Sequence, residues 1–245
     1  MRALLVIASL LACAPVGAQE AQPLVADLSK HLVAITTGFV GTEVLLFGAV
    51  DGPGDVVVVV RGPPRPEVVR RKERVGGIWV NTGRADLAAV PAYYRVAATR
   101  PLPELAPPAV LERHRIGLEH LDLEPVLADK GAGAAEYRQA LIRLKRDRGL
   151  WAAETREVSS LGNRLFRTDL HFPANVPTGT YSVEVYLLRG GEVVSAQTTP
   201  LIVSKIGLGA ELYHFAHEHG AAYGIMAIAL AGAAGWLAAA AFRKG

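Results

Sequence analysis

The longest apolar stretch of the chain lies at its C-terminal end. Residues 220–242 carry no charged side chain, and the basic residues Arg243 and Lys244 follow directly. Since an α-helix rises about 1.5 Å per residue, this stretch is long enough to cross a hydrocarbon core about 30 Å thick. The pattern predicts a transmembrane helix over residues 220–242 and a short tail over 243–245. Because Arg and Lys beside a span stay on the cytoplasmic side, we expect a cytoplasmic C-terminus.

Small residues recur at every fourth position of this predicted helix, at Ala227, Ala231, Gly235 and Ala239. Such spacing lets two helix backbones approach closely within a membrane. We therefore expect this face to pack against a helix of an integral membrane partner. The alternative is that the spacing arises by chance, because the stretch is rich in Ala and Gly.

The N-terminal residues have the pattern of a targeting segment. Arg2 precedes an apolar stretch, and small residues come before Gln19. This pattern is typical of a secretory signal peptide, so we expect residues 1–18 to be removed by cleavage after Ala18. Cys13, the only cysteine, offers lipidation as an alternative. The signal peptide and the transmembrane helix together predict a single-pass protein of a bacterial inner membrane. The helix would lie in the lipid bilayer, and the bulk of the chain would lie in the periplasm.

Two regions, 19–104 and 155–204, show the apolar patterns of β-strands. Within the first, Val56–Val60 is apolar at every position, which predicts a central strand buried on both faces. The prolines of Gly62–Pro66 predict a loop, because proline cannot donate a ladder hydrogen bond. The expected strands are Leu32–Thr36, Thr42–Val50, Asp55–Arg61, Gly77–Val80, Ala92–Ala98, Leu165–Phe172, Tyr181–Leu187 and Val193–Val203.

The residues between these regions, 105–154, form a helical segment in our interpretation. Tyr137, Leu141 and Leu144 recur at helical spacing and form an apolar stripe that should pack on the β body. Basic residues of the same helix, Lys145 among them, are expected in solvent, with anionic lipid or an acidic partner as the alternative. The expected helices are Val110–His120 and Ala134–Leu150.

The expected fold class is mainly β, with an immunoglobulin-like β-sandwich type of periplasmic region, a helical segment and one C-terminal transmembrane helix. Pro177–Tyr181, which leads into an alternating strand, looks like the closing hairpin of bacterial immunoglobulin-like sandwiches. The two β regions are compatible with two small sandwiches or with one sandwich that carries a helical insertion. We favour two.

Composition and motifs indicate a binding protein and not an enzyme. A net charge of +3 with 20% charged residues describes an ordinary surface, so no nucleic-acid partner is expected. The sequence contains no Gly-x-Ser-x-Gly turn, phosphate-binding glycine loop or His-Glu-x-x-His motif, and we expect no catalytic residue and no bound organic cofactor. Trp79 and Trp151 are expected in the core, although an exposed one would mark a binding face.

The segment before the span, residues 205–219, carries the one polar cluster of interest. Carboxylates and imidazoles lie close together there and suit Zn²⁺ or another borderline divalent cation, provided that a second helix or the sandwich supplies further ligands. Because histidine titrates near pH 6.5, a pH sensor is an alternative. A plain amphipathic collar with solvated polar tips is another. The candidate metal ligands are Glu211, His214, His217 and Glu218.

Several short motifs are spread over the chain. They are Phe39-Val40-Gly41, Leu46-Phe47-Gly48-Ala49, Val60-Arg61-Gly62-Pro63, Gly77-Ile78-Trp79-Val80, Tyr223-Gly224, Gly235-Trp236 and Phe242-Arg243. Together they resemble the alphaproteobacterial putative transmembrane protein family. The resemblance covers nearly all of the mature chain, and it implies a membrane location and this architecture. It also implies an accessory role beside a transporter such as a sulfite-exporter-like permease, and it carries over no catalytic residue.

The function expected from the sequence is therefore binding or scaffolding of a membrane partner by a single-pass, membrane-anchored periplasmic protein. The alternative is a periplasmic module that binds a metal or small ligand through the His/Glu cluster of residues 205–219.

Overall fold

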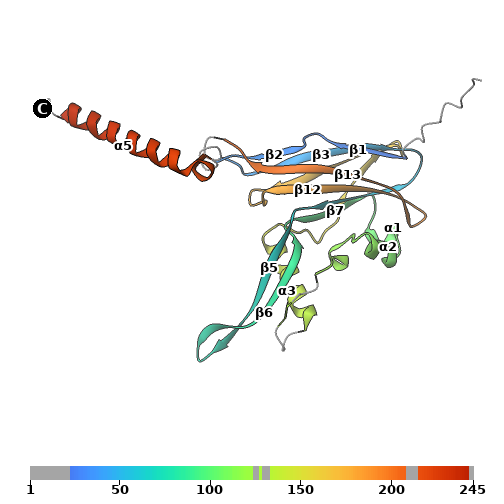
Figure 1. Cartoon of the computed structure of the whole chain (residues 1–245). Coiled ribbons are helices and arrows are strands. Elements are labelled where there is room, and N and C mark those ends of the chain that lie inside the picture. Colours follow the sequence, from blue (N-terminus) through green and yellow to red (C-terminus); the bar gives the residue numbers. More distant parts are fainter. Residues whose placement is uncertain (1–22, 124–126, 129–132, 208–214, 243–245) are drawn as a thin grey trace, which may run out of the picture.

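The computed structural model describes residues 23–123, 127–128, 133–207 and 215–242. The protein is mainly β, as expected, with three sheets, a helical segment and a long C-terminal helix, α5 (Gly220–Phe242) (Figure 1). The predicted signal peptide over residues 1–18, with Cys13, and the tail over 243–245 lie outside the described residues.

Antiparallel pairing dominates the three sheets. Sheet A has the order β1 (Leu24–Leu28), β3 (Gly41–Val50), β11 (Leu165–Pro173) and β10 (Ser159–Leu161). Sheet B has the order β2 (Leu32–Ile35), β13 (Glu192–Lys205), β12 (Gly179–Arg189), β4 (Asp55–Arg61), β7 (Tyr94–Ala98) and β9 (Arg156–Glu157). Sheet C has the order β5 (Pro64–Val75), β6 (Ile78–Pro91) and β8 (Leu127–Ala128).

Strands from both predicted β regions lie in the same sheets. β11 pairs with β3 in sheet A, and β12 pairs with β4 in sheet B. The preference for two separate sandwiches is therefore wrong, because sheets A and B each contain strands from both sides of the helical segment. The assignment to the immunoglobulin-like type stays a prediction.

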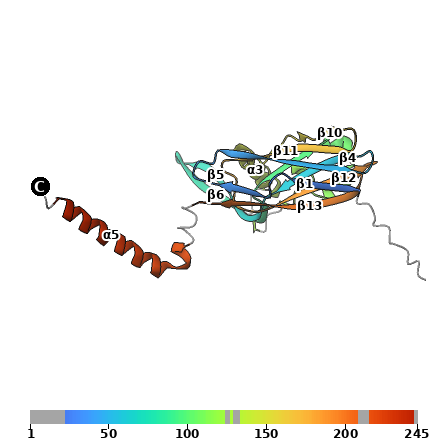
Figure 2. The ribbon, with the colours of Figure 1, turned by 90° about the horizontal axis from the view of Figure 1, so that it is seen from above.

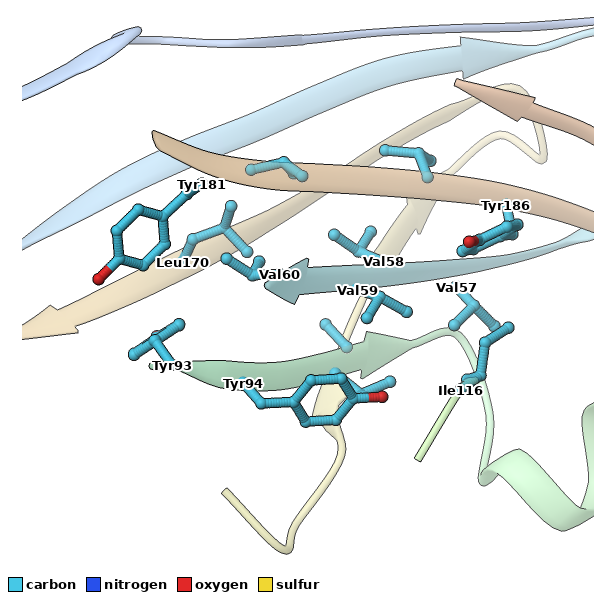
Figure 3. Packing of buried hydrophobic residues seen from close by; sticks show 14 of the residues in the cluster. Val57, Val58, Val59, Val60, Tyr93, Tyr94, Ile116, Leu170, Tyr181 and Tyr186 are labelled. Carbon is cyan, nitrogen blue, oxygen red and sulfur yellow. The ribbon is translucent and has the colours of Figure 1, made fainter. Parts of the chain in front are cut away.

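The centre of the core is β4, in which Val56–Val60 are all 2% exposed or less. β4 lies between β12 and β7, and its valines alternate between the two faces of sheet B (Figure 3). Register places Val58 and Val60 on the face of Tyr93 and Tyr181, whose rings contact Phe172 of sheet A. The prediction of a strand buried on both sides is confirmed.

The opposite face of sheet B is covered by the helical segment. The expected helix over Val110–His120 is broken, because Arg115 and Gly117 have positive φ angles of 53° and 100°. The expected helix Ala134–Leu150 forms but ends earlier, before Gly149 with a φ of 69°. The helices are α1 (Leu102–Leu105), α2 (Pro108–Arg113), the 3₁₀ turn η1 (Leu118–His120) and α3 (Ala134–Asp147).

Strands β5 and β6 form a long hairpin that projects from the body beside α3 (Figure 1). The prediction of a loop over Gly62–Pro66 is wrong, since β5 already begins at Pro64. The ladder shifts register between Arg65 and Glu67, so Pro66 sits at an irregularity where no hydrogen-bond donor is needed.

Helix α3 packs on the base of this hairpin. A Cβ at Gly83 of β6 would lie 2.5 Å from the Tyr137 hydroxyl, so only glycine allows this approach. Lys145, expected in solvent, is 4% exposed, and its Nζ lies 2.5 Å from Oε1 of Glu67 in β5. The basic side of α3 is therefore partly an internal surface, because the hairpin covers it.

We predict that Val58→Ala lowers the free energy of unfolding by about 2 kcal/mol, because the change removes buried methyl groups and leaves a cavity. Val194→Ala, at a position that is 47% exposed, is the matched control and should change it by less than about 0.5 kcal/mol. Denaturant unfolding of the full chain in detergent measures both. Equal effects would contradict the central placement of β4.

Candidate functional site

The described part of the body contains a groove of about 1090 Å³. It lies between the helical segment, α3 and the edge of sheet B at β9. Its floor is apolar and its rim carries charges of both signs. The floor includes Leu102, Ala106, Leu111, Ile116, Leu118 and Ile142, and the rim includes Arg100, Glu119, His120, Arg146, Glu154, Arg156 and Glu157.

Prolines shape the wall of the groove. Helix α2 begins with Pro108, whose fixed φ suits the first helical position, and Pro107 precedes it in an extended conformation. The short helices bury Leu105 and Leu111 against the core and leave Leu118 half-buried at the groove. The floor is thus apolar surface that the fold itself does not cover fully.

The helical segment is fixed to sheet B by polar contacts of β4 and β7. The Arg61 guanidinium donates hydrogen bonds of 2.9 Å to the carbonyls of His114 and Arg115, and it forms an ion pair with Glu184. The Tyr94 hydroxyl donates to the Arg115 carbonyl at 3.0 Å and accepts from the Gly117 amide at 2.8 Å. These bonds satisfy backbone groups that the broken helix leaves unpaired.

An ion pair stands at the rim of the groove. Arg100 donates its Nε–H to Oδ1 of Asp55 at 3.0 Å and a second N–H to Oδ2, and Thr99 donates its hydroxyl to Oδ1 at 3.0 Å. The hydrogen bond from Arg100 holds the pKa of the Asp55 carboxyl below its ordinary value, and the bond from Thr99 adds to this effect. The pair joins the start of β4 to the groove wall.

Several buried tyrosines have raised pKa values, and the cause is their burial. Burial raises the pKa of Tyr94 to about 12, and burial also raises the pKa of Tyr93 and Tyr181. The Tyr93 hydroxyl donates to the His171 carbonyl, and that of Tyr181 donates to the Pro177 carbonyl at 2.6 Å. These phenol hydroxyls thus connect strands and loops within the core through hydrogen bonds.

The segment before α5 is described only from Phe215 on. Phe215 stacks on His219 with ring centroids 5.7 Å apart and meets Tyr223 edge-on at 6.4 Å. Backbone hydrogen bonds from His219 to Phe215 and from Tyr223 to His219 join this turn to α5, which gives an aromatic collar at the start of the span.

The metal hypothesis stays a prediction. His217 and Glu218 lie exposed on this turn, but Glu211 and His214 fall outside the described residues. Among the residues that the structure does describe, no group of three or more His, Cys, Asp or Glu is placed to hold a metal ion.

Helix α5 has the length and composition of a membrane span. It covers 23 residues with a mean hydropathy of 2.0, and none of the assessed window is buried inside the protein. The small residues Ala227, Ala231, Gly235 and Ala239 are all exposed along it. Their pairing with a partner helix stays a prediction.

The sequence matches the family described as "putative transmembrane protein (Alph_Pro_TM)" over residues 23–244. The chain belongs to this family. The match begins beside β1 and includes α5, so the whole β body and the apolar helix are parts of the family's shared architecture. No curated protein matches the chain.

One stretch on which the resemblance was based, Gly77-Ile78-Trp79-Val80, lies at the tip of the β5–β6 hairpin. The expectation that both tryptophans lie in the core holds for Trp151, which is 2% exposed and donates its Nε1–H to the Pro91 carbonyl at 3.0 Å. It is wrong for Trp79, which is 69% exposed. The sequence analysis associates an exposed tryptophan with a binding face. The exposure of Trp79 was not predicted, because the length of the β5–β6 hairpin was not predicted.

We predict that Asp55→Asn lowers the melting temperature most at neutral pH. Because the folded-state pKa of Asp55 is lowered, the carboxylate stabilises the fold above its ordinary pKa of about 3.9, and this contribution is lost as the pH falls through the folded-state value. Thermal unfolding from pH 7 to pH 2.5 should show the difference between the two proteins narrowing below about pH 4.

The control for this measurement is Asp147→Asn, at an exposed residue that ends α3. A difference between wild type and Asp55→Asn that stays constant down to pH 2.5 would contradict a stabilising carboxylate at this position.

Proposed function

We propose that the protein is a non-enzymatic binding subunit of a membrane complex. Helix α5 anchors it in the bacterial inner membrane, its body lies in the periplasm, and the groove beside β9 holds a polypeptide segment of a membrane partner such as a transporter. The observation that carries this proposal is the groove itself, an open apolar floor with a charged rim.

The chemistry of the groove suits a polypeptide. Leu102, Leu118 and Ile142 pack on the core but remain partly exposed, so an apolar side chain from a partner would complete their burial. Arg146 and Glu154 on the rim give both charge signs, which suits backbone and side-chain groups of a peptide. The volume of about 1090 Å³ exceeds the range of about 300–1,000 Å³ that is typical of small-molecule sites.

The anchor supports a partner that is itself in the membrane. All described side chains of the assessed window of α5 lie outside the protein core, so its Ala231 and Gly235 face is open to a neighbouring helix. Arg243 and Lys244 follow the helix in the sequence and favour a cytoplasmic C-terminus, which places the body in the periplasm.

The proposal is tested by site-specific photo-crosslinking in native membranes. A diazirine side chain at Leu118, on the groove floor, should yield one discrete protein adduct. The matched control is Val40, which is 88% exposed and does not line the groove. A second pair, Ala231 and Leu230, tests the anchor, and Ala231 should give an adduct with the same partner.

Identical adducts from Leu118 and Val40, or no protein adduct from Leu118, would overturn the role of the groove. Adducts from Leu118 without any from Ala231 would leave the groove as the binding site and reject the helix contact.

A further inference from the structure

The β5–β6 hairpin, which we call the arm, ends in an exposed apolar tip. Val75 and Ile78 pair across the turn Gly76-Gly77, whose φ angles of 59° and 89° allow a tight two-residue connection. Val75, Ile78 and Trp79 are 56%, 66% and 69% exposed. Val75 and Ile78 share one face of the arm, and Trp79, which pairs with Arg74, lies on the other, so large apolar side chains flank the turn on both faces.

One face of the arm is cationic. The register pairs Arg70 with Arg84 and Arg74 with Trp79, and Lys72 shares their side because alternate residues of a strand point the same way. Glu73 lies on the other face and forms an ion pair with Arg71 at 3.0 Å. Arg84 forms an ion pair with Asp86, two residues along β6, at 2.8 Å. The net positive charge of this side therefore comes from Arg70, Lys72 and Arg74 of β5, which it shares with Trp79.

The base of the arm is held by α3. Tyr137 lies against Gly83, Lys145 pairs with Glu67, and Arg71 lies 3.6 Å from Glu136. Despite these contacts, the side chains of β5 from Arg70 to Val75 are all exposed. The tip is therefore carried on a supported strand pair and is not covered by the described part of the chain.

The membrane is within reach of this tip. The chain from Lys205, the end of β13, to Gly220, the start of α5, spans at most about 50 Å even when fully extended. In both views the arm lies on the side of the body from which α5 extends, and Figure 1 shows it projecting away from the other sheets (Figures 1 and 2). A bilayer that holds α5 therefore lies close to that end.

We propose that the arm is a second membrane contact, in which Val75, Ile78 and Trp79 enter the headgroup region of an anionic bilayer. The cationic face then lies against lipid phosphates. Tryptophan favours the boundary between headgroups and acyl chains, and basic residues near a membrane surface are attracted to anionic lipid. This contact does not depend on the partner that we propose for the groove.

The shape of the tip favours lipid over a protein partner. Three apolar side chains on a two-residue turn form a wedge suited to an insertion depth of about 5–10 Å. A stable protein interface needs roughly 800 Å² from each partner, which a hairpin end offers less readily. The body would then be held at two points, which fixes its orientation relative to the bilayer.

The test uses the full chain in vesicles of pure lipid, where no protein partner is present. With Cys13→Ser in the background, Asn81→Cys, at an exposed position two residues from Trp79, carries an environment-sensitive fluorophore near the tip, and Val40→Cys carries it at the control position. In vesicles with about 30% phosphatidylglycerol, the tip fluorophore should shift to the blue and be quenched by brominated lipid, while the control should not.

Charge-removing variants distinguish an electrostatic contact with anionic lipid from nonspecific hydrophobic adsorption. Arg70→Gln, Lys72→Gln and Arg74→Gln together should lower the fraction of inserted tip at least about fivefold. Arg113→Gln, Arg143→Gln and Arg167→Gln change the net charge equally at exposed positions outside the arm and should leave it unchanged. Circular dichroism of each variant shows that the fold is kept.

Equal insertion into phosphatidylcholine and phosphatidylglycerol vesicles, or equal loss in both triple variants, would overturn the cationic contact. Tip protection that appears only in native membranes, together with a protein crosslink from the tip, would overturn the lipid contact in favour of an acidic protein.

Discussion

The structure depends on one constraint, which is that β4 must be covered on both faces. Five consecutive valines leave neither side of this strand polar, and each is almost fully buried. Sheet A covers one face and the helical segment covers the other. The helical segment is therefore part of the core, and the groove exists because the outer surface of that segment is not covered in turn.

The polar bonds around Arg61 show how this arrangement is stabilised. A helix broken at Arg115 and Gly117 leaves backbone groups without intrahelical partners, and burying them unpaired would be costly. Arg61 and Tyr94, which sit opposite each other in the β4–β7 ladder, supply the missing partners. The groove wall is thus fixed by the same strand pair that forms the centre of the core.

The sequence predicted what depends on apolar patterning and missed what depends on tertiary contact. The strand over Asp55–Arg61 and the helix over residues 220–242 follow from apolar patterning, so their bounds were predicted closely. Of the arm, only a strand over Gly77–Val80 was predicted. The outer part of β5 is charged and exposed, and no periodicity marks a strand without a buried face. The burial of Lys145 was missed because Glu67 reaches it only in the folded chain.

The candidate sites, too, depend on tertiary contacts that the sequence pattern does not show. Residues of the groove come from three stretches of the chain, 98–120, 142–146 and 153–157, and only their packing brings them together. Trp79 belongs to a stretch on which the family resemblance was based, but its exposure becomes apparent only when the hairpin is seen to project from the body. Of the predicted metal ligands, the structure describes His217 and Glu218 alone, so the metal site stays a prediction.

Our central claim is that α5 holds the groove and the arm on one side of a membrane, opposite the C-terminus. Impermeant maleimide labelling of Val194→Cys and Gly245→Cys, in a Cys13→Ser chain and in intact spheroplasts, tests it most directly. We expect Val194→Cys to react at once and Gly245→Cys to react only after the membrane is disrupted. Labelling of Gly245→Cys in intact spheroplasts, or protection of Val194→Cys there, would contradict the account.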